Sequence, residues 1–168
     1  MAAPMPHVEA YDRGLALLQA GRVSAALGEL EVAHRARPDD ISVLFALGNA
    51  ARALGLHDSA ARFFNDVLSI DPDRIEATVQ LAKSLAASTR HGDAIEALQR
   101  ALALRSDAAV LWVTLGNVVR EQGDTANAEI FLREALRLNP KSAEALGGGA
   151  DILFDAGKRR EALKLYNR

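Results

Sequence analysis

The sequence contains no cysteine, few aromatic residues and no excess of charge of either sign. Without cysteine, it has no disulfide framework, thiolate metal site or cysteine nucleophile. Its formal net charge of -2 excludes the broad basic field that nucleic-acid binders use to displace counterions. No run approaches the roughly 18 consecutive apolar residues of a membrane span, and the first residues lack a signal-peptide pattern. We therefore expect a soluble, cytoplasmic protein that binds neither nucleic acid nor membrane.

Alanine and leucine are abundant instead. Hydrophobic residues make 49% of the 168 residues and charged residues 25%, whereas Phe, Trp and Tyr together make 5%. This balance is typical of folded chains, and small, unbranched side chains suit helices packed closely against other helices. The composition therefore favours an all-helical fold.

Proline, glycine and alanine each recur at a spacing of 34 residues. The positions are Pro38, Pro72 and Pro140, with Ser106 in the missing place; Gly21, Gly55, Gly123 and Gly157, with Thr89 in the missing place; and Ala26, Ala60, Ala94, Ala128 and Ala162. Three kinds of residue that agree on one period indicate an internal repeat. The predicted units are 7–40, 41–74, 75–108 and 109–142, with a partial fifth at 143–168 and an N-terminal tail at 1–6.

Each unit carries two amphipathic stripes at helical spacing. In the second unit Leu44, Leu47 and Ala51 form one stripe, and Phe64 belongs to the other. Gly55 lies where the chain reverses between them. The pattern predicts ten helices and no strands. The aspartates that follow the proline positions are predicted to cap the next helix: Asp39, Asp73 and Asp107.

The period and its pattern point to one repeat family. The fourth unit carries Trp112, Leu115-Gly116, Ala128 and Pro140 at the expected places, so the chain resembles a tetratricopeptide repeat array over nearly all of its length after residue 6. The resemblance implies an all-α fold, a right-handed α-solenoid of antiparallel helix pairs. It also implies that the first helices of successive units line a concave groove that holds an extended peptide or a partner's helix.

The resemblance and the repeat positions together predict groove residues on these first helices. Asn49 and Arg52 are repeated as Asn117 and Arg120, with Lys83 between them, and such side chains can bind a peptide backbone or a carboxylate. We therefore expect a protein or peptide partner with acidic groups; the alternative is an ordinary solvated helix face. The predicted groove residues are Phe45, Asn49, Arg52, Val79, Gln80, Lys83, Val113, Asn117, Arg120 and Asp151. Acidic groove positions gather toward the C-terminal end: Glu121, Glu144, Asp151 and Asp155.

No catalytic constellation, metal site or cofactor motif is found in the sequence. The four histidines lack partners at i+3 or i+4, and we expect no metal ion. Gly147-Gly148-Gly149 lacks the spacing of a phosphate-binding loop and falls inside a predicted helix, which predicts a weakened last unit. We therefore predict a non-catalytic scaffold. The lysine with which well-known peptide-binding relatives hold a terminal carboxylate is absent from the fifth places, so chaperone C-terminus binding is not carried over.

Two alternatives concern the partial fifth unit, 143–168. Because the sequence stops inside a repeat, we expect either that the polypeptide continues or that a partner chain covers this end. In the first case the array would be the N-terminal, substrate-presenting region of a larger glycosyl-, methyl- or sulfotransferase. In the second it would self-associate through the incomplete repeat.

Overall fold

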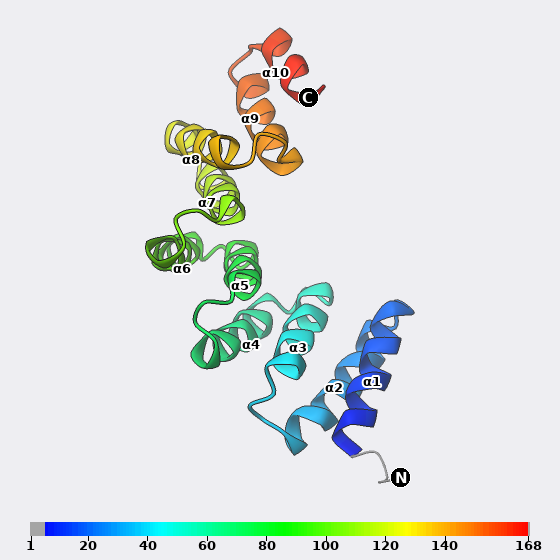
Figure 1. Ribbon diagram of the computed structural model, residues 1–168. Coiled ribbons are helices and arrows are strands. Elements are labelled where there is room, and N and C mark those ends of the chain that lie inside the picture. Colours follow the sequence, from blue (N-terminus) through cyan, green and yellow to red (C-terminus); the bar gives the residue numbers. More distant parts are fainter. Residues whose placement is uncertain (1–5, 168) are drawn as a thin grey trace. The chain divides into compact units, whose positions relative to one another are not determined.

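The computed structural model describes residues 6–167, without the side chain of Pro6, and in that range it contains ten α-helices and no strand. The predicted tail at 1–6 lies outside the described residues, apart from Pro6, which begins the first helix. In chain order the helices, labelled in Figure 1, are α1 (Pro6–Gln19), α2 (Val23–Ala36), α3 (Ile41–Ala53), α4 (His57–Ile70), α5 (Ile75–Ala87), α6 (His91–Leu104), α7 (Ala109–Glu121), α8 (Thr125–Leu138), α9 (Ala143–Asp155) and α10 (Arg159–Tyr166).

The helices fall into two compact units that meet in sequence between Ser88 and Thr89. In the first unit α1 packs on α2, α2 on α3, α3 on α4 and α4 on α5; in the second, each helix from α6 to α10 packs on the next. Helix pairs stacked in chain order are the architecture of an α-solenoid, so the predicted fold class is confirmed. The predicted repeat 75–108 supplies α5 to the first unit and α6 to the second.

Left-handed residues reverse the chain between the two helices of each pair, where the sequence predicts them. The backbone angle φ is positive at Gly21, Gly55, Gly123 and Gly157, and also at Thr89, where it is 61°. Glycine adopts this conformation without steric cost, whereas a β-branched residue is strained in it. Thr89 is therefore a strained turn residue, and it lies at the boundary of the two compact units.

Close helix contacts in the core depend on a small residue facing a large one. A Cβ atom added to Gly48 of α3 would lie 2.7 Å from the ring of Phe64 on α4, and one added to Gly116 of α7 would lie 2.8 Å from Leu132 on α8. Phe64 and Leu132 are fully buried. The same arrangement thus closes one helix pair in each compact unit.

The predicted aspartate caps are wrong by one position. The α3 helix is capped by Asp40, whose side chain accepts hydrogen bonds from the backbone N–H groups of Ser42 and Val43. The residues before α5 and α7 are Arg74 and Ala108, neither of which makes a side-chain cap. Asp39, Asp73 and Asp107 stand one residue earlier than these capping positions, outside the place from which a side chain caps the helix.

Side-chain caps are present at two helices of the second unit. Ser142 caps α9, and Asp124 caps α8. The pKa of Asp124 is lowered by hydrogen bonds from the side chain and then the backbone of Asn127. Both caps stabilise helix starts that the 34-residue spacing alone does not distinguish.

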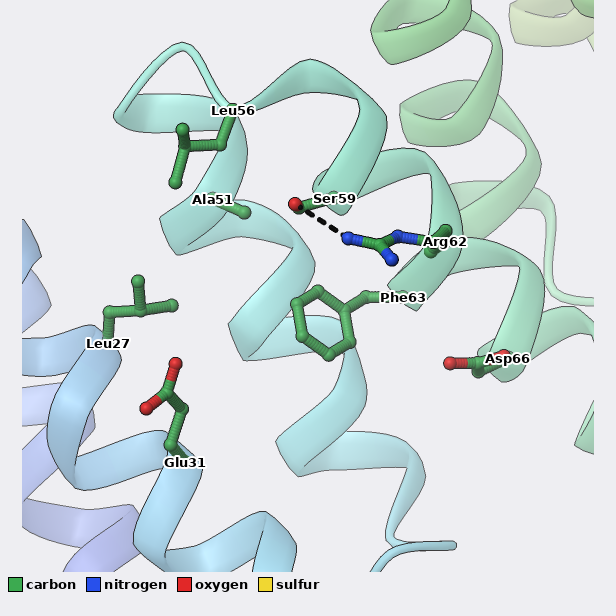
Figure 2. A pocket seen from close by; sticks show the side chains of 8 residues that line it. All are labelled: Leu27, Glu31, Ala51, Leu56, Ser59, Arg62, Phe63 and Asp66. Carbon is green, nitrogen blue, oxygen red and sulfur yellow. Dashed lines mark hydrogen bonds between the residues drawn. The ribbon is translucent and has the colours of Figure 1, made fainter.

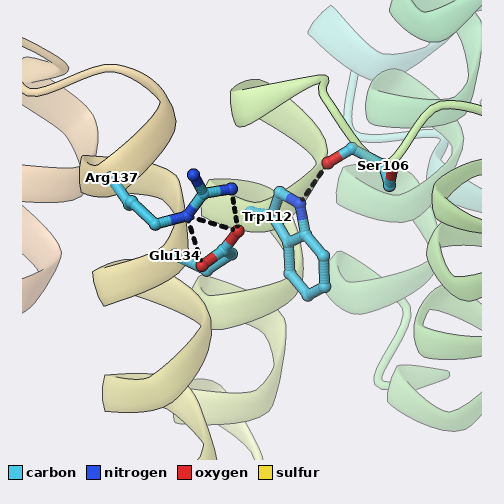
Figure 3. Close-up of polar contacts among 4 residues, drawn as sticks. All are labelled: Ser106, Trp112, Glu134 and Arg137. Carbon is cyan, nitrogen blue, oxygen red and sulfur yellow. Dashed lines mark hydrogen bonds and ion pairs between the residues drawn. The ribbon is translucent and has the colours of Figure 1, made fainter.

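Trp112 stabilises the turn in which Ser106 replaces the recurring proline. Its indole N–H donates a 2.9 Å hydrogen bond to the carbonyl oxygen of Ser106 (Figure 3), and its ring lies 5.9 Å from that of Phe131 between centroids. Beside it, Arg137 forms a two-pronged ion pair with Glu134, which lowers the pKa of Glu134. The tryptophan thus orders the entrance to α7 without a proline.

The three consecutive glycines lie within the continuous helix α9, and two of them have a packing role. Gly148 is buried, and a Cβ there would lie 3.0 Å from the side-chain oxygen of Asn117 and 3.1 Å from Leu132. A Cβ on Gly149 would lie 3.1 Å from Leu165. Only Gly147, of the three, faces open space. Close helix approach therefore explains Gly148 and Gly149, and the weakening of the last unit stays a prediction.

Candidate functional site

In the first compact unit, the predicted groove residues lie on α3 and α5, which contact each other directly. The side chains of Arg52 and Lys83 are exposed, and Asn49 and Gln80 are half-buried. The side-chain oxygen of Gln80 is buried and has no hydrogen-bond partner within residues 6–167. An unsatisfied buried acceptor costs about 1–3 kcal/mol, so a donor from a bound chain would relieve that cost.

Phe45 occupies the same face of α3, and neighbouring side chains partly cover it. Its ring lies 5.5 Å from that of Phe64, and the Arg74 guanidinium lies 4.9 Å from the Phe45 ring centroid. Such a cation–π contact is worth roughly 0.5–1 kcal/mol at exposed sites. Phe45 is thus a fixed, half-buried part of the face.

Two apolar residues that the sequence assigns to the groove surface belong to the core. Val79 on α5 is 6% exposed, and Val113 on α7 is 2% exposed. Helix α5 packs against α4 and α3, and α7 packs against α6 and α8, so each of them buries a wider stripe than a surface helix buries. Val79 and Val113 therefore support the groove residues from beneath and do not present a surface to a ligand.

In the second compact unit, the corresponding face on α7 and α9 carries an internal ion pair. A guanidinium nitrogen of Arg120 lies 3.7 Å from a carboxylate oxygen of Asp151, and Tyr166 of α10 donates a hydrogen bond to the same aspartate. This hydrogen bond raises the pKa of Tyr166. Arg120 is therefore already paired within the protein, whereas the sequence analysis predicts it as a cation that binds a ligand.

Asn117 lies on the same helix as Arg120, three residues before it. Asn117 lies against Gly148, whose lack of a side chain leaves room for the amide. The Nε atom of Arg120 is buried and finds no partner in the part of the chain that the structure describes. This arrangement suits contacts with neutral polar groups better than with a carboxylate, because Asp151 already neutralises the guanidinium.

One polar contact of the second unit was not expected from the sequence. Nε2 of His91, at the start of α6, lies 3.9 Å from a carboxylate oxygen of Glu121 at the end of α7. A search for partners at i+3 or i+4 cannot find this contact, because its two residues come from different helices. Within residues 6–167, no three His, Asp or Glu side chains are grouped so that they could hold a metal ion.

Comparison with known proteins settles the family. A family model described as a tetratricopeptide repeat matches residues 11–75 and 79–143, and a second model of the same description matches 119–168. The chain belongs to the tetratricopeptide repeat family. Family membership supports a protein–protein interaction scaffold in general, and tetratricopeptide proteins of this fold are generally non-catalytic.

Two curated relatives are similar in sequence to this chain. Protein FlbA of Caulobacter vibrioides is 36% identical over 143 residues, which cover 85% of this chain and 24% of FlbA. A probable biofilm formation methyltransferase of Pseudomonas aeruginosa is 36% identical over 84 residues, or 50% of this chain and 20% of that protein. The chain thus spans about a quarter of FlbA.

The solved structures share the fold. A tetratricopeptide protein of Thermus thermophilus, 24% identical, superposes with a TM-score of 0.77 over 96% of this chain and 88% of its own. MamA, also 24% identical, superposes with a TM-score of 0.75 over 92% of this chain and 90% of its own. Among the described helices, none is both long and apolar enough to cross a membrane.

Proposed function

We propose that this chain is a non-catalytic, cytoplasmic scaffold that binds an extended peptide or a partner helix along the first helices of its repeats. The observation that carries the proposal is the face of α3 and α5, where Arg52 and Lys83 are exposed on two helices in contact. Exposed cations on two helices in contact favour a ligand with carboxylates. An acidic segment of a partner protein is therefore the expected ligand.

Hydrogen bonding adds to this charge preference. The buried oxygen of Gln80 is an acceptor without a partner in the described structure, and a peptide N–H group is the matching donor. The half-buried amide of Asn49 can both donate to and accept from a peptide backbone. The first unit would thus hold a peptide by its main chain and select it by its charge.

The test is a charge reversal on this face. The double variant Arg52→Glu, Lys83→Glu should weaken binding of a capped peptide rich in Glu and Leu by at least about tenfold, measured by calorimetry, because attraction becomes repulsion. Helicity and melting temperature should stay unchanged. A control, Arg22→Glu with Arg37→Glu, makes the same change of net charge on exposed residues outside α3 and α5. Equal affinities for the two variants would contradict the proposal.

A second candidate is that the array presents substrates to a transferase domain of a longer protein. The similarity to a part of the probable methyltransferase of Pseudomonas aeruginosa favours it. Reading the gene beyond Arg168 tests it directly. A transferase domain there would support this function, and a stop codon would remove it.

Self-association through α10 is a third candidate. Leu163 and Tyr166 on this helix are 62% and 51% exposed, and Phe154 before it is 52% exposed. Burial of such side chains between two copies is favourable. Sedimentation should then show an average mass that rises with protein concentration. The variant Leu163→Lys should have a lower average mass at the same concentration. A monomer mass at every concentration would contradict self-association.

A further inference from the structure

Apart from the proposed peptide-binding face, the first compact unit has a concave feature between its second helices. A cleft of about 390 Å³ opens between α2 and α4, with one wall from each helix and its end at the turn after α3. This volume lies within the range of about 300–1,000 Å³ that is typical of ligand pockets. The cleft shares no lining residue with the proposed peptide-binding face. The lining residues, shown in Figure 2, are Leu27, Glu31, Ala51, Leu56, Ser59, Arg62, Phe63 and Asp66.

The cleft has an apolar centre. Phe63 of α4 lies in its middle, and Leu27 of α2 and the 48% exposed Leu56 lie toward one end. His34 of α2 meets the Phe63 ring edge-on, with 6.2 Å between the ring centroids. This contact fixes the aromatic ring between the two helices, so the cleft exists before any ligand binds.

Two carboxylates flank this aromatic ring without a cation of their own. Figure 2 shows Glu31 on one side of Phe63 and Asp66 on the other. Neither carboxylate has an ion pair or side-chain hydrogen bond in the part of the chain that the structure describes. Arg62, four residues before Asp66, could pair with it along the helix, but its guanidinium instead donates a 3.1 Å hydrogen bond to the hydroxyl of Ser59.

This combination selects for a cation on an apolar stem. A lysine or arginine side chain lays its methylene groups on apolar surface and keeps its charged end among polar groups. The face of a phenylalanine attracts such a cation, and the two carboxylates pair with it. A carboxylate or phosphate ligand would instead meet two like charges and only one cation, Arg62.

We propose that the cleft between α2 and α4 binds a basic segment of a partner protein, whose arginine or lysine side chain enters over Phe63 and pairs with Glu31 and Asp66. The occupant follows from charge complementarity, since the cleft is lined by two carboxylates and one cation, Arg62, and its net charge is negative. Two separate surfaces of the first unit would then bind segments of opposite charge. This proposal does not depend on the peptide-binding face of α3 and α5.

The probe is a short capped peptide of Ala and Leu with one central arginine, compared with its twin that carries neutral citrulline. Titrated into the isotopically labelled full chain, the arginine peptide should shift amide signals of α2 and α4, and the citrulline peptide should bind about tenfold more weakly. The variant Glu31→Gln, Asp66→Asn should also lose about tenfold, since each exposed ion pair contributes a few-fold. The control Asp39→Asn, Asp73→Asn removes the same charge from exposed loops and should bind as the wild type does.

A further variant is expected to raise the affinity for the arginine peptide. Arg62→Gln removes the cation that competes for the cleft and should strengthen binding of the arginine peptide about threefold, since one exposed charge is worth less than a factor of ten. Failure of the wild type to bind, equal binding of the two peptides, or shifts confined to α3 and α5 would each overturn the proposal. Loss of binding in Arg52→Glu, Lys83→Glu would overturn it as well, because those residues lie outside the cleft.

Discussion

The two compact units carry the same Asn and Arg motif in different surroundings. In the first unit, Arg52 on α3 is exposed, and the neighbouring first helix supplies Lys83. In the second unit, Arg120 on α7 pairs with Asp151 at the equivalent place on the neighbouring helix, and Tyr166 holds that aspartate. An identical motif therefore stands beside a lysine in one unit and is neutralised by an aspartate in the other.

This difference teaches that the function of a repeat residue depends on the next repeat. Asn49 and Asn117 occupy the same place, and so do Arg52 and Arg120, but the sign of the facing charge is reversed. A repeat array can thus keep the same fold in every unit. The charge of one residue on a first helix then decides which ligand charge the neighbouring first helix can bind.

The largest effect is expected from a glycine that both units share. Gly48→Val should lower the free energy of unfolding by about 3 kcal/mol, because its Cβ alone would lie 2.7 Å from the buried Phe64 ring. In contrast, Gly147→Ala in the second unit should raise it by about 1 kcal/mol, since that position faces open space and alanine favours a helix. Urea unfolding followed by circular dichroism measures both, and changes of the same sign would contradict the packing argument.

Exchanging the facing charges should exchange the binding properties of the two units. The double variant Lys83→Asp, Asp151→Lys should lose about tenfold in affinity for the acidic peptide at α3 and α5 and gain a comparable amount at α7 and α9. Isotope-edited titration identifies the unit that binds. Shifts that stay on α3 and α5 would show that residues other than Lys83 and Asp151 set the preference.

The smallest effect concerns Tyr166, whose counterpart in the helix pair of the first unit is the buried Phe64. The hydrogen bond to Asp151 raises the pKa of Tyr166 above its ordinary value of 10.0. Its stabilising contribution is therefore complete below that value and is lost as the pH rises through the folded-state pKa. Tyr166→Phe should melt slightly below the wild type at neutral pH, and the difference should vanish in strong alkali. A difference that persists there would contradict the role of this hydrogen bond.

The sequence predicted most of the fold, because a left-handed turn or a close helix contact requires glycine or another small residue at that one position. Gly21, Gly55, Gly123 and Gly157 all adopt the left-handed turn that their spacing predicts. The helix caps could not be assigned as reliably, since Asp39 and Asp40 are adjacent and a shift of one residue decides which side chain reaches the N–H groups.

The candidate site was less predictable, because its properties arise between helices. Nothing along α7 shows that Arg120 meets Asp151, and the burial of Val79 and Val113 depends on two packed neighbours. The cleft between α2 and α4 likewise combines residues 27–66, and no motif marks it. Its residues lie outside the first-helix positions that the repeat pattern assigns to the groove.

The threonine at the division between the units has a consequence for how the chain reaches this structure. A left-handed conformation costs an L-residue other than glycine about 1–2 kcal/mol, so an unfolded chain rarely samples it at Thr89. The turns at Gly21, Gly55, Gly123 and Gly157 carry no such cost. We therefore predict that the helix pairs that turn at glycine form first during folding and that the α5–α6 turn is completed last.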